Sequence, residues 1–505
     1  MRKIFSFLFL VPCILSAQND ALFETQDIKL TGKVYKYEII DLNGDSLKEI
    51  IAFTEEGKSL NSKKYINILW QTETGFLNDK MQKFAPHRET ILFDFGNLVP
   101  ETPGREFVLL MNDGIYCYAL ESNQKYDLTK KLIIKTSSIF KNRDVDDFIY
   151  WDFVKDINRN WKDEILIPQF NNYLVYAYSD SGTWEILSQL RLPSKTNINS
   201  HRNISVSYSP KDLYFADCNT DDLIDIITLE KDNFSIFYQQ ENGSYSTTPD
   251  LNFNMEFFKD EEKVGEEIVI QFLKDINDDG IIDMLASKIS ARESIFNPQS
   301  QIQIYFGKLQ KDRLFSLTPD QIIVSSGVQF EHKLIDFNND SKIDLAIPSI
   351  KLGLLRIIKI LLTKQVTLDV SIYKMNENGL YPEKPDLEKN LTIKFDFSIN
   401  ESSAEGSGTT PVFRLNGDFD GDGLLDLISA VDQRKFEIYK GDSDKIFSRT
   451  ADLKVEVNLP KNGDDVAVYD LDNNGKSDII IRYRKQDDKS GELQKLIKIL
   501  MNRME

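Results

Sequence analysis

The chain has 505 residues, of which 41% are hydrophobic and 28% charged, a composition typical of a globular protein with a large core. Its 80 acidic residues outnumber 61 Lys and Arg and give a net charge of −19, which repels phosphate backbones and excludes nucleic acid as an expected partner. Three His and three Cys are too few and too scattered for a zinc ribbon, a disulfide scaffold or a Cys/His nucleophile pair.

The first 17 residues, MRKIFSFLFLVPCILSA, have the features of a signal peptide. A basic start precedes an apolar stretch of roughly 14 residues, which is shorter than the roughly 20 residues that a membrane-spanning helix needs. An uncleaved anchor and lipidation at Cys13 are the alternatives, and Pro12 directly before Cys13 argues against the second. We therefore expect residues 1–17 to be removed and residues 18–505 to be secreted or held at the cell surface.

The two remaining cysteines, Cys117 and Cys218, both occupy apolar positions and lie about 100 residues apart. A disulfide is an option in an oxidising compartment, but the repeats described next place the two residues in different units. We expect two free, buried thiols. No later segment is apolar enough to span a membrane, because even residues 352–362 include Arg356 and Lys359.

A nine-residue acidic pattern recurs along the chain, with Asp first, Asn or Asp third and fifth, and Asp or Glu ninth. Seven copies begin at Asp41, Asp156, Asp217, Asp275, Asp336, Asp418 and Asp470. The interval from the first to the second is about twice the usual one, which predicts a degenerate copy from Asp94, in which a Pro-containing insertion has replaced the third and fifth positions. With this copy the mean interval is about 61 residues, so eight units account for residues 18–505 as a single domain.

Each unit has the same strand pattern. An alternating apolar strand precedes the acidic loop, a β-rich segment follows it, and an aromatic strand comes next, as at 65–70, 173–178, 234–238, 302–306 and 436–440. Adding a weaker fourth strand gives units of four antiparallel strands, whose radial repetition makes an all-β, eight-bladed β-propeller. Seven blades, or a parallel β-solenoid, are the alternatives. The last unit ends at its third strand, 496–502, so residues 27–32 are expected to complete that blade and close the ring.

The acidic loops offer hard oxygen donors at positions one, three, five and nine, which suit Ca²⁺ better than zinc. An Asx-rich turn that needs no metal is the alternative for any single loop, whereas seven copies favour calcium. An EF-hand is excluded because position twelve is not Glu and the flanks are strands. The predicted ligands are Asp41, Asn43, Asp45 and Glu49; Asp156, Asn158, Asn160 and Glu164; Asp217, Asn219, Asp221 and Asp225; Asp275, Asn277, Asp279 and Asp283; Asp336, Asn338, Asp340 and Asp344; Asp418, Asp420, Asp422 and Asp426; Asp470, Asp472, Asn474 and Asp478.

The donors also rank the loops. The Asp418 loop, with four carboxylates and Gly423 at the bend, is expected to bind calcium most tightly. The Asp156 loop, with two carboxylates and Trp161 at the bend, is expected to bind most weakly, and the Asp94 copy is expected to bind none.

These loops resemble the DxDxDGxxD calcium loops of FG-GAP or VCBS-type repeats, which join the first and second strands of propeller blades in integrin α subunits and many secreted bacterial proteins. The Asp275, Asp418 and Asp470 loops carry the resemblance most clearly, and the Gly-Ala-Pro segment of the family name is missing. The resemblance implies a calcium-stabilised propeller with a role in extracellular binding or adhesion.

Two classes of function remain open. The first is a non-enzymatic protein that binds an extracellular protein or a glycan. The second is a carbohydrate-active enzyme similar to polysaccharide lyases, or a lectin, on the same propeller. No catalytic residue is predicted, because the recurrent carboxylates are assigned to metal. A ligand is expected on the face opposite the acidic loops, near insertions at 287–300, 350–365 and 399–410.

Overall fold

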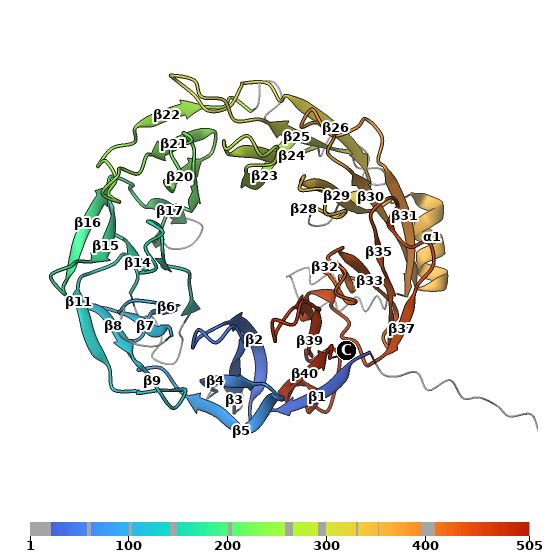
Figure 1. The fold of residues 1–505 in the computed structure, drawn as a ribbon, viewed down its shortest axis with the longest axis horizontal. Helices are drawn as coiled ribbons and strands as arrows, with labels where there is room; N and C mark the ends of the chain where they lie inside the picture. Colours follow the sequence, from blue (N-terminus) through green and yellow to red (C-terminus); the bar gives the residue numbers. More distant parts are fainter. Residues whose placement is uncertain are drawn as a thin grey trace, which may run out of the picture.

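The computed structural model describes residues 22–57, 62–99, 104–141, 149–199, 205–257, 266–290, 299–329, 332–351, 353–394 and 410–503. The expected signal peptide lies outside these residues, as do most of the insertions at 287–300 and 399–410. The described chain forms eight small antiparallel sheets arranged as the blades of a β-propeller (Figure 1). The eight-bladed all-β fold expected from the repeat is confirmed.

The blades follow one another in chain order, and the first strand of each lies nearest the axis (Figure 1). Blades one to four consist of β2 (Lys33–Ile40), β3 (Glu49–Glu56), β4 (Lys63–Thr72) and β5 (Gly75–Phe84); β6 (Leu92–Gly96), β7 (Glu106–Met111), β8 (Gly114–Tyr118) and β11 (Lys131–Lys135), with β12 (Ile149–Tyr150) added parallel to β6; β13 (Val154–Lys155), β14 (Glu164–Pro168), β15 (Tyr173–Tyr178) and β16 (Trp184–Leu190); and β19 (Leu213–Ala216), β20 (Asp225–Glu230), β21 (Asn233–Phe237) and β22 (Leu251–Asn254).

Blades five to eight repeat the arrangement. They consist of β23 (Glu266–Lys274), β24 (Asp283–Ser290), β25 (Gln299–Tyr305) and β26 (Gln321–Ser326); β27 (Val328–Gln329) and β28 (Lys333–Ile335), both paired with β29 (Asp344–Ile350), then β30 (Gln365–Tyr373) and β31 (Leu387–Lys394); β32 (Phe413–Gly417), β33 (Asp426–Asp432), β34 (Lys435–Tyr439) and β37 (Leu453–Glu456); and β38 (Val466–Tyr469), β39 (Asp478–Arg482), β40 (Leu496–Met501) and β1 (Glu24–Lys29).

The ring closes through the N-terminal strand. β1 pairs antiparallel with β40, from Glu24 opposite Met501 to Lys29 opposite Leu496, so the eighth blade is completed by the other end of the chain. Ile28 and Leu30 are buried in an apolar cluster with residues of blades one and eight. The predicted closure is confirmed, and it leaves β40 without an open edge.

Apolar side chains pack between neighbouring blades and form the core. Between blades one and two, for example, Phe93 stacks on Phe107 with ring centroids 5.1 Å apart, and Phe53 lies against Phe93. Cys117 and Cys218 are buried and free, as expected. Because each sheet contributes one face to each of two clusters, the blades cannot separate without exposing apolar surface.

A few elements lie outside the blades. They are the hairpins β9 (Leu120–Glu121) with β10 (Lys125–Tyr126), β17 (Lys195–Asn199) with β18 (Ser205–Ser209), and β35 (Gly441–Asp442) with β36 (Ile446–Phe447); two short 3₁₀ turns, η1 (Gly463–Asp465) and η2 (Leu493–Lys495); and the helix α1 (Leu354–Thr363). Among the described residues, no helix has both the length and the apolar character needed to cross a membrane.

Candidate metal-binding loops

The seven acidic loops all join the first strand of a blade to its second strand. They are named here by their first residues: the Asp41, Asp156, Asp217, Asp275, Asp336, Asp418 and Asp470 loops. Since the first strand of each of these seven blades lies nearest the axis and leads into such a loop, the loops emerge on one face of the ring.

The loops share one backbone conformation. Their fourth and sixth residues have φ between 56° and 84° in all seven copies, in the left-handed region that favours glycine. The residues in this conformation are Gly44, Ser46, Arg159, Trp161, Thr220, Asp222, Asp278, Gly280, Asn339, Ser341, Gly421, Gly423, Asn473 and Gly475. The bend at position six was expected from the glycines, but the second bend at position four was not, because only two copies have Gly there. Non-glycine residues hold the same bends, so the side chains of the loop must stabilise them.

The first and fifth side chains supply that stabilisation. In the Asp418 loop, Gly421 N–H and Gly423 N–H donate to the two oxygens of Asp418, at 2.7 and 2.9 Å. Leu424 N–H donates to Asp422 Oδ1 at 2.9 Å. A bond from the seventh N–H to the fifth side chain recurs in all seven loops. These are Asx-type turns, which form with or without a metal.

The ninth carboxylate is buried and holds the loop to the blade. In every copy it accepts the N–H of the second residue, as when Phe419 N–H donates to Asp426 Oδ2 at 2.7 Å. Gly441 N–H, after the third strand, donates to Asp426 Oδ1 at 2.7 Å. Burial raises the pKa of the five ninth-position Asp side chains to about 7 and that of Glu49 and Glu164 to about 8, with the other loop carboxylates adding to the rise.

The third position divides the loops into two kinds. Where it is Asn, its side-chain N–H₂ group can donate to the fifth side chain, as Asn219 Nδ2 does to Asp221 Oδ2 at 2.9 Å. Where it is Asp, in the Asp418 and Asp470 loops, no such donor exists. Asp420 Oδ1 and Asp472 Oδ1 are buried and have no hydrogen-bond partner among the described residues. A buried carboxylate oxygen without a donor is costly, and a cation relieves that cost.

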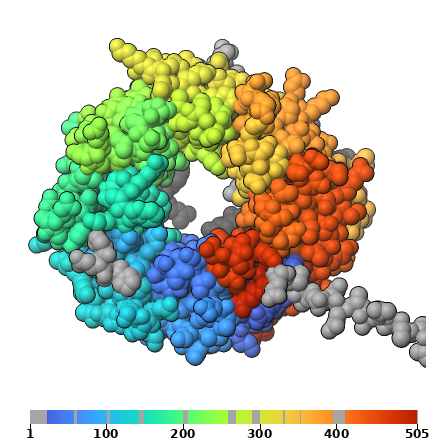
Figure 2. Space-filling view, viewed as in Figure 1, coloured from blue at the N-terminus to red at the C-terminus, as the bar shows by residue number. Residues whose placement is uncertain are grey.

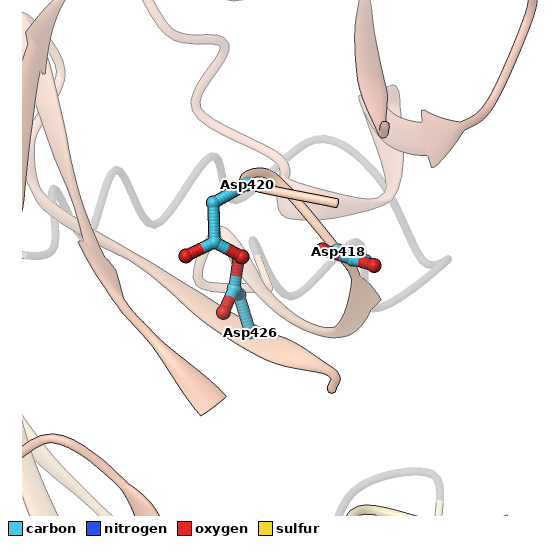
Figure 3. A group of neighbouring side chains, drawn as sticks. All are labelled: Asp418, Asp420 and Asp426. Carbon is cyan, nitrogen blue, oxygen red and sulfur yellow. The ribbon is translucent and has the colours of Figure 1, made fainter. Parts of the chain in front are cut away.

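These two loops also bring their carboxylates together. One oxygen each of Asp418, Asp420 and Asp426 lies within 4.8 Å of the others, and Figure 3 shows the carboxylates of Asp420 and Asp426 close together with Asp418 beside them. Asp470, Asp472 and Asp478 form an equivalent group. The hard oxygen donors fit a Ca²⁺ ion. Cations already lie nearby, since Lys440 Nζ is 2.7 Å from Asp420 Oδ2 and Arg503 Nε is 4.0 Å from Asp472 Oδ2.

The other five loops are more self-contained. The third-position amide donates to the fifth carboxylate in the Asp41, Asp217, Asp275 and Asp336 loops, although Glu49 Oε1 and Asn338 Oδ1 are buried without a partner among the described residues. In the Asp156 loop, Asn158 Nδ2 donates instead to Glu164 Oε1 at 2.6 Å, and Trp161 is 84% exposed. In these five loops the ligands expected from the sequence lie in the same positions, but internal hydrogen bonds use more of their oxygens.

The degenerate copy differs from its expected alignment. Asp94 lies inside β6, where its Oδ2 accepts Phe153 N–H at 2.8 Å and Val154 N–H at 2.9 Å, and not at the start of the loop. Leu98 N–H donates to Glu106 Oε2 at 2.9 Å, the bond made elsewhere by the second and ninth residues. Asn97 and Glu106 therefore correspond to positions one and nine. The altered spacing of the Pro-containing insertion hides this correspondence in the sequence.

Several adjacent loops are hydrogen-bonded to each other. Ser477 N–H donates to the carbonyl of Asp418 at 2.6 Å, Lys48 N–H to that of Leu471 at 2.9 Å, and Asp163 N–H to that of Asn97 at 2.9 Å. The second of these bonds joins blades eight and one. The acidic loops thus form a belt on one face, through which neighbouring blades contact each other.

Two pockets lie toward the opposite face. A polar pocket of about 460 Å³ surrounds the β20–β21 turn of blade four and includes Lys211, Thr228, Asn233 and Asn252. The buried Thr228 hydroxyl has no hydrogen-bond partner among the described residues. A smaller pocket of about 180 Å³ between blades three and four shares Lys211 and is walled by aromatic side chains. Neither pocket is at the insertions where a ligand was expected.

A comparison with family models agrees with the repeat. Residues 418–481 match the family model of an FG-GAP-like repeat. Solved structures that the chain matches include an Agrocybe aegerita lectin that specifically recognises non-reducing terminal N-acetylglucosamine, at 12% identity, 83% coverage of this chain, 94% coverage of the lectin and a TM-score of 0.39. They also include the V. cholerae biofilm matrix protein Bap1, at 11% identity, 94% coverage of this chain, 89% coverage of Bap1 and a TM-score of 0.31. No curated protein matches the chain in sequence.

Proposed function

We propose that this FG-GAP-repeat β-propeller protein is an exported, calcium-stabilised binding or adhesion protein that catalyses no reaction. The observation that carries the metal part of the proposal is the unpartnered, buried Oδ1 of Asp420 beside Asp418 and Asp426. Asp470, Asp472 and Asp478 would hold a second ion in the same way. Bound calcium would supply positive charge to these carboxylates, and its role in the fold would be structural.

The loops themselves prepare the ligands. Backbone N–H groups orient the first and ninth carboxylates, so the free energy gained from binding is not spent on ordering the loop. A cation that binds only the folded chain stabilises it by about 2.7 kcal/mol per independent site at 100 times its Kd. Several occupied loops would therefore dominate the stability of the propeller.

Calcium titration calorimetry and thermal unfolding test the metal part. We expect several bound ions and a melting temperature that falls by several degrees in chelator. Asp420→Asn should weaken the tightest site, whereas Asp180→Asn, at an exposed turn residue outside the loops, should leave both measurements unchanged. A melting temperature indifferent to chelator would contradict the proposal.

The binding part rests on the division of the ring into two faces. The carboxylates are concentrated in the belt of loops, and the two pockets of blades three and four lie toward the other face. An extracellular protein or a glycan is the proposed partner. A screen of glycan and matrix-protein arrays, in calcium and in chelator, should find a ligand whose binding is weakened by Asn252→Ala in the larger pocket. Release of unsaturated, ultraviolet-absorbing product from acidic polysaccharides would instead identify a lyase.

A further inference from the structure

The helix α1 is the one described α-helix, and it lies on the outer circumference of the ring beside β31 (Figure 1). It is inserted between the second and third strands of blade six, within the insertion expected at 350–365. Ten residues, LLRIIKILLT, form it. Its position on the rim makes its outer side accessible to a large, flat surface.

The outer side of α1 is apolar. Leu355, Ile358, Leu361 and Leu362 are 82%, 45%, 68% and 80% exposed. Leu355, Ile358 and Leu362 follow an i, i+3, i+7 spacing, and Leu361 extends the same side, so the four form one stripe, here named the α1 stripe. Ile357 and Ile360, on the other side, are half-buried. The helix therefore uses one apolar side for packing and leaves a second one without a partner among the described residues.

The outward strand of the same blade is polar where it is exposed. This strand, β31, exposes Glu388, Asn390, Thr392 and Lys394 and buries Leu391 and Ile393. A contiguous group of four large aliphatic side chains in water is costly, and such groups commonly mark a contact surface. The α1 stripe therefore does not continue the exposed surface of β31.

The charges around α1 indicate what it contacts. Residues 353–365 include Arg356, Lys359 and Lys364 and no acidic residue, although the chain as a whole has a net charge of −19. Lys394 is paired in register with Gln365, directly after the helix, and adds a further cation. A nearby acid, Asp369, is buried and lies 3.5 Å from Arg356 and 3.7 Å from Lys351. This basic patch on an acidic protein is complementary to an anionic surface.

We propose that α1 docks the propeller onto an anionic lipid bilayer. The α1 stripe would enter the boundary between headgroups and acyl chains, with Lys359 and its neighbouring cations at the level of the anionic headgroups. An exposed aliphatic stripe flanked by Lys and Arg is the arrangement of helices that lie in a membrane interface without crossing it. This surface is separate from the acidic loops, so the inference does not depend on calcium binding.

Vesicle flotation tests the proposal. The protein beginning at Gln18 would be mixed with vesicles of phosphatidylcholine alone, or with about 30% phosphatidylglycerol, at one constant free calcium concentration. We expect binding to the anionic vesicles that weakens with added salt, and at least a tenfold loss of the partition coefficient in Leu355→Ser/Leu362→Ser. Lys359→Gln should weaken binding to the anionic vesicles selectively.

A matched control separates the stripe from general surface hydrophobicity. Ile186→Ser/Val324→Ser removes two aliphatic side chains that are 56% and 59% exposed on β16 and β26, and it should leave the partition coefficient unchanged. The melting temperature of each variant checks its fold, and calcium titration checks the loops independently. Equal binding by the α1 variant and the parent would overturn the proposal. So would a concentration-dependent dimer that the α1 substitutions abolish without any binding to vesicles, or capture of an acidic peptide in place of lipid.

Discussion

Individual loop residues stabilise the loop turns and are also proposed to bind calcium, and one matched pair of substitutions separates the two effects. Asp418 and Asp156 both accept backbone N–H groups from their own loops, so Asp→Ala removes similar turn bonds at either position. Asp418 also lies with Asp420 and Asp426, whereas the Asp156 loop has two carboxylates at its predicted ligand positions. We expect Asp418→Ala to cost more calcium-dependent stability, by about 2–3 kcal/mol at saturating calcium. Calcium titration calorimetry and unfolding of both variants measure this difference, and equal losses would contradict the ranking.

Trp161 provides a second test at the scale of one residue. It holds φ of 70° at the bend of the Asp156 loop and is 84% exposed, so it strains the backbone without contributing much packing. We expect Trp161→Gly to raise the free energy of unfolding by roughly 0.5–1 kcal/mol. Glycine removes the strain of the left-handed conformation, and its greater loss of backbone entropy on folding offsets part of that gain. Urea unfolding in chelator measures the change. Gly423→Ala, at the same position of another loop, should lower stability. If Trp161→Gly lowered stability as well, the Trp161 side chain would have to contribute packing energy.

His332 predicts a pH dependence that is separate from the loops. It is buried, its Nε2 lies 3.0 Å from Gln329 Oε1, and burial lowers its pKa to about 4. Since the unfolded chain takes up a proton near pH 6.5 and the folded chain only near pH 4, stability is lost as the pH falls through that interval. The loss should approach about 3 kcal/mol at pH 4. His332→Gln should remove this component, which the difference between the two stability–pH profiles would reveal.

At the scale of the element, the loop pattern predicted the strand order because the same residues that suit a metal also form Asx turns between two strands. The ring closure was predictable too, since residues 27–32 alternate like a strand and the last unit has only three. The left-handed backbone conformation at the fourth loop position was not predictable, because residues such as Arg159 and Thr220 do not indicate it in the sequence. Nor could the sequence show that the buried ninth carboxylate accepts N–H groups after the third strand, since that contact joins residues 15 apart in the case of Asp426 and Gly441.

Blade two shows how an element keeps its role after losing the loop pattern. Asp94 is 2% exposed and links β6 to the start of blade three through Phe153 N–H and Val154 N–H. We expect Asp94→Ala to lower the free energy of unfolding by about 2–3 kcal/mol, because two buried donors lose their acceptor. This loss should be the same in calcium and in chelator, in contrast to that of Asp418→Ala. Urea unfolding in calcium and in chelator measures the loss of stability. A loss that depends on calcium would indicate that Asp94 is a metal ligand after all.

At the scale of the whole molecule, the ring distributes two kinds of surface. Figure 2 shows the blades closed into a ring around a central opening. The belt of loops gathers carboxylates on one face of this ring, where hydrogen bonds between adjacent loops join neighbouring blades. The seam between blades eight and one contains such a bond and also Arg482, which pairs with the buried Asp465 and donates to the Tyr35 carbonyl. If the Asp470 loop binds calcium as proposed, loss of that ion should weaken the seam as well as its own blade.

The same seam is where the covalent chain is open, so β1 should determine whether the ring stays closed. Its removal would uncover the hydrogen-bonding edge of β40 and take Phe23, Ile28 and Leu30 out of the core. Burial of three such side chains contributes about 5 kcal/mol or more. A chain beginning at Lys33 should therefore unfold at a markedly lower temperature and associate through its open edge, as measured by calorimetry and size-exclusion chromatography. A chain beginning at Leu22 is the matched control and should behave as the parent, and a synthetic peptide of residues 22–32 should restore the shortened chain. Unchanged stability after loss of β1 would mean that the contacts between blades hold the ring closed without a fourth strand in the eighth sheet.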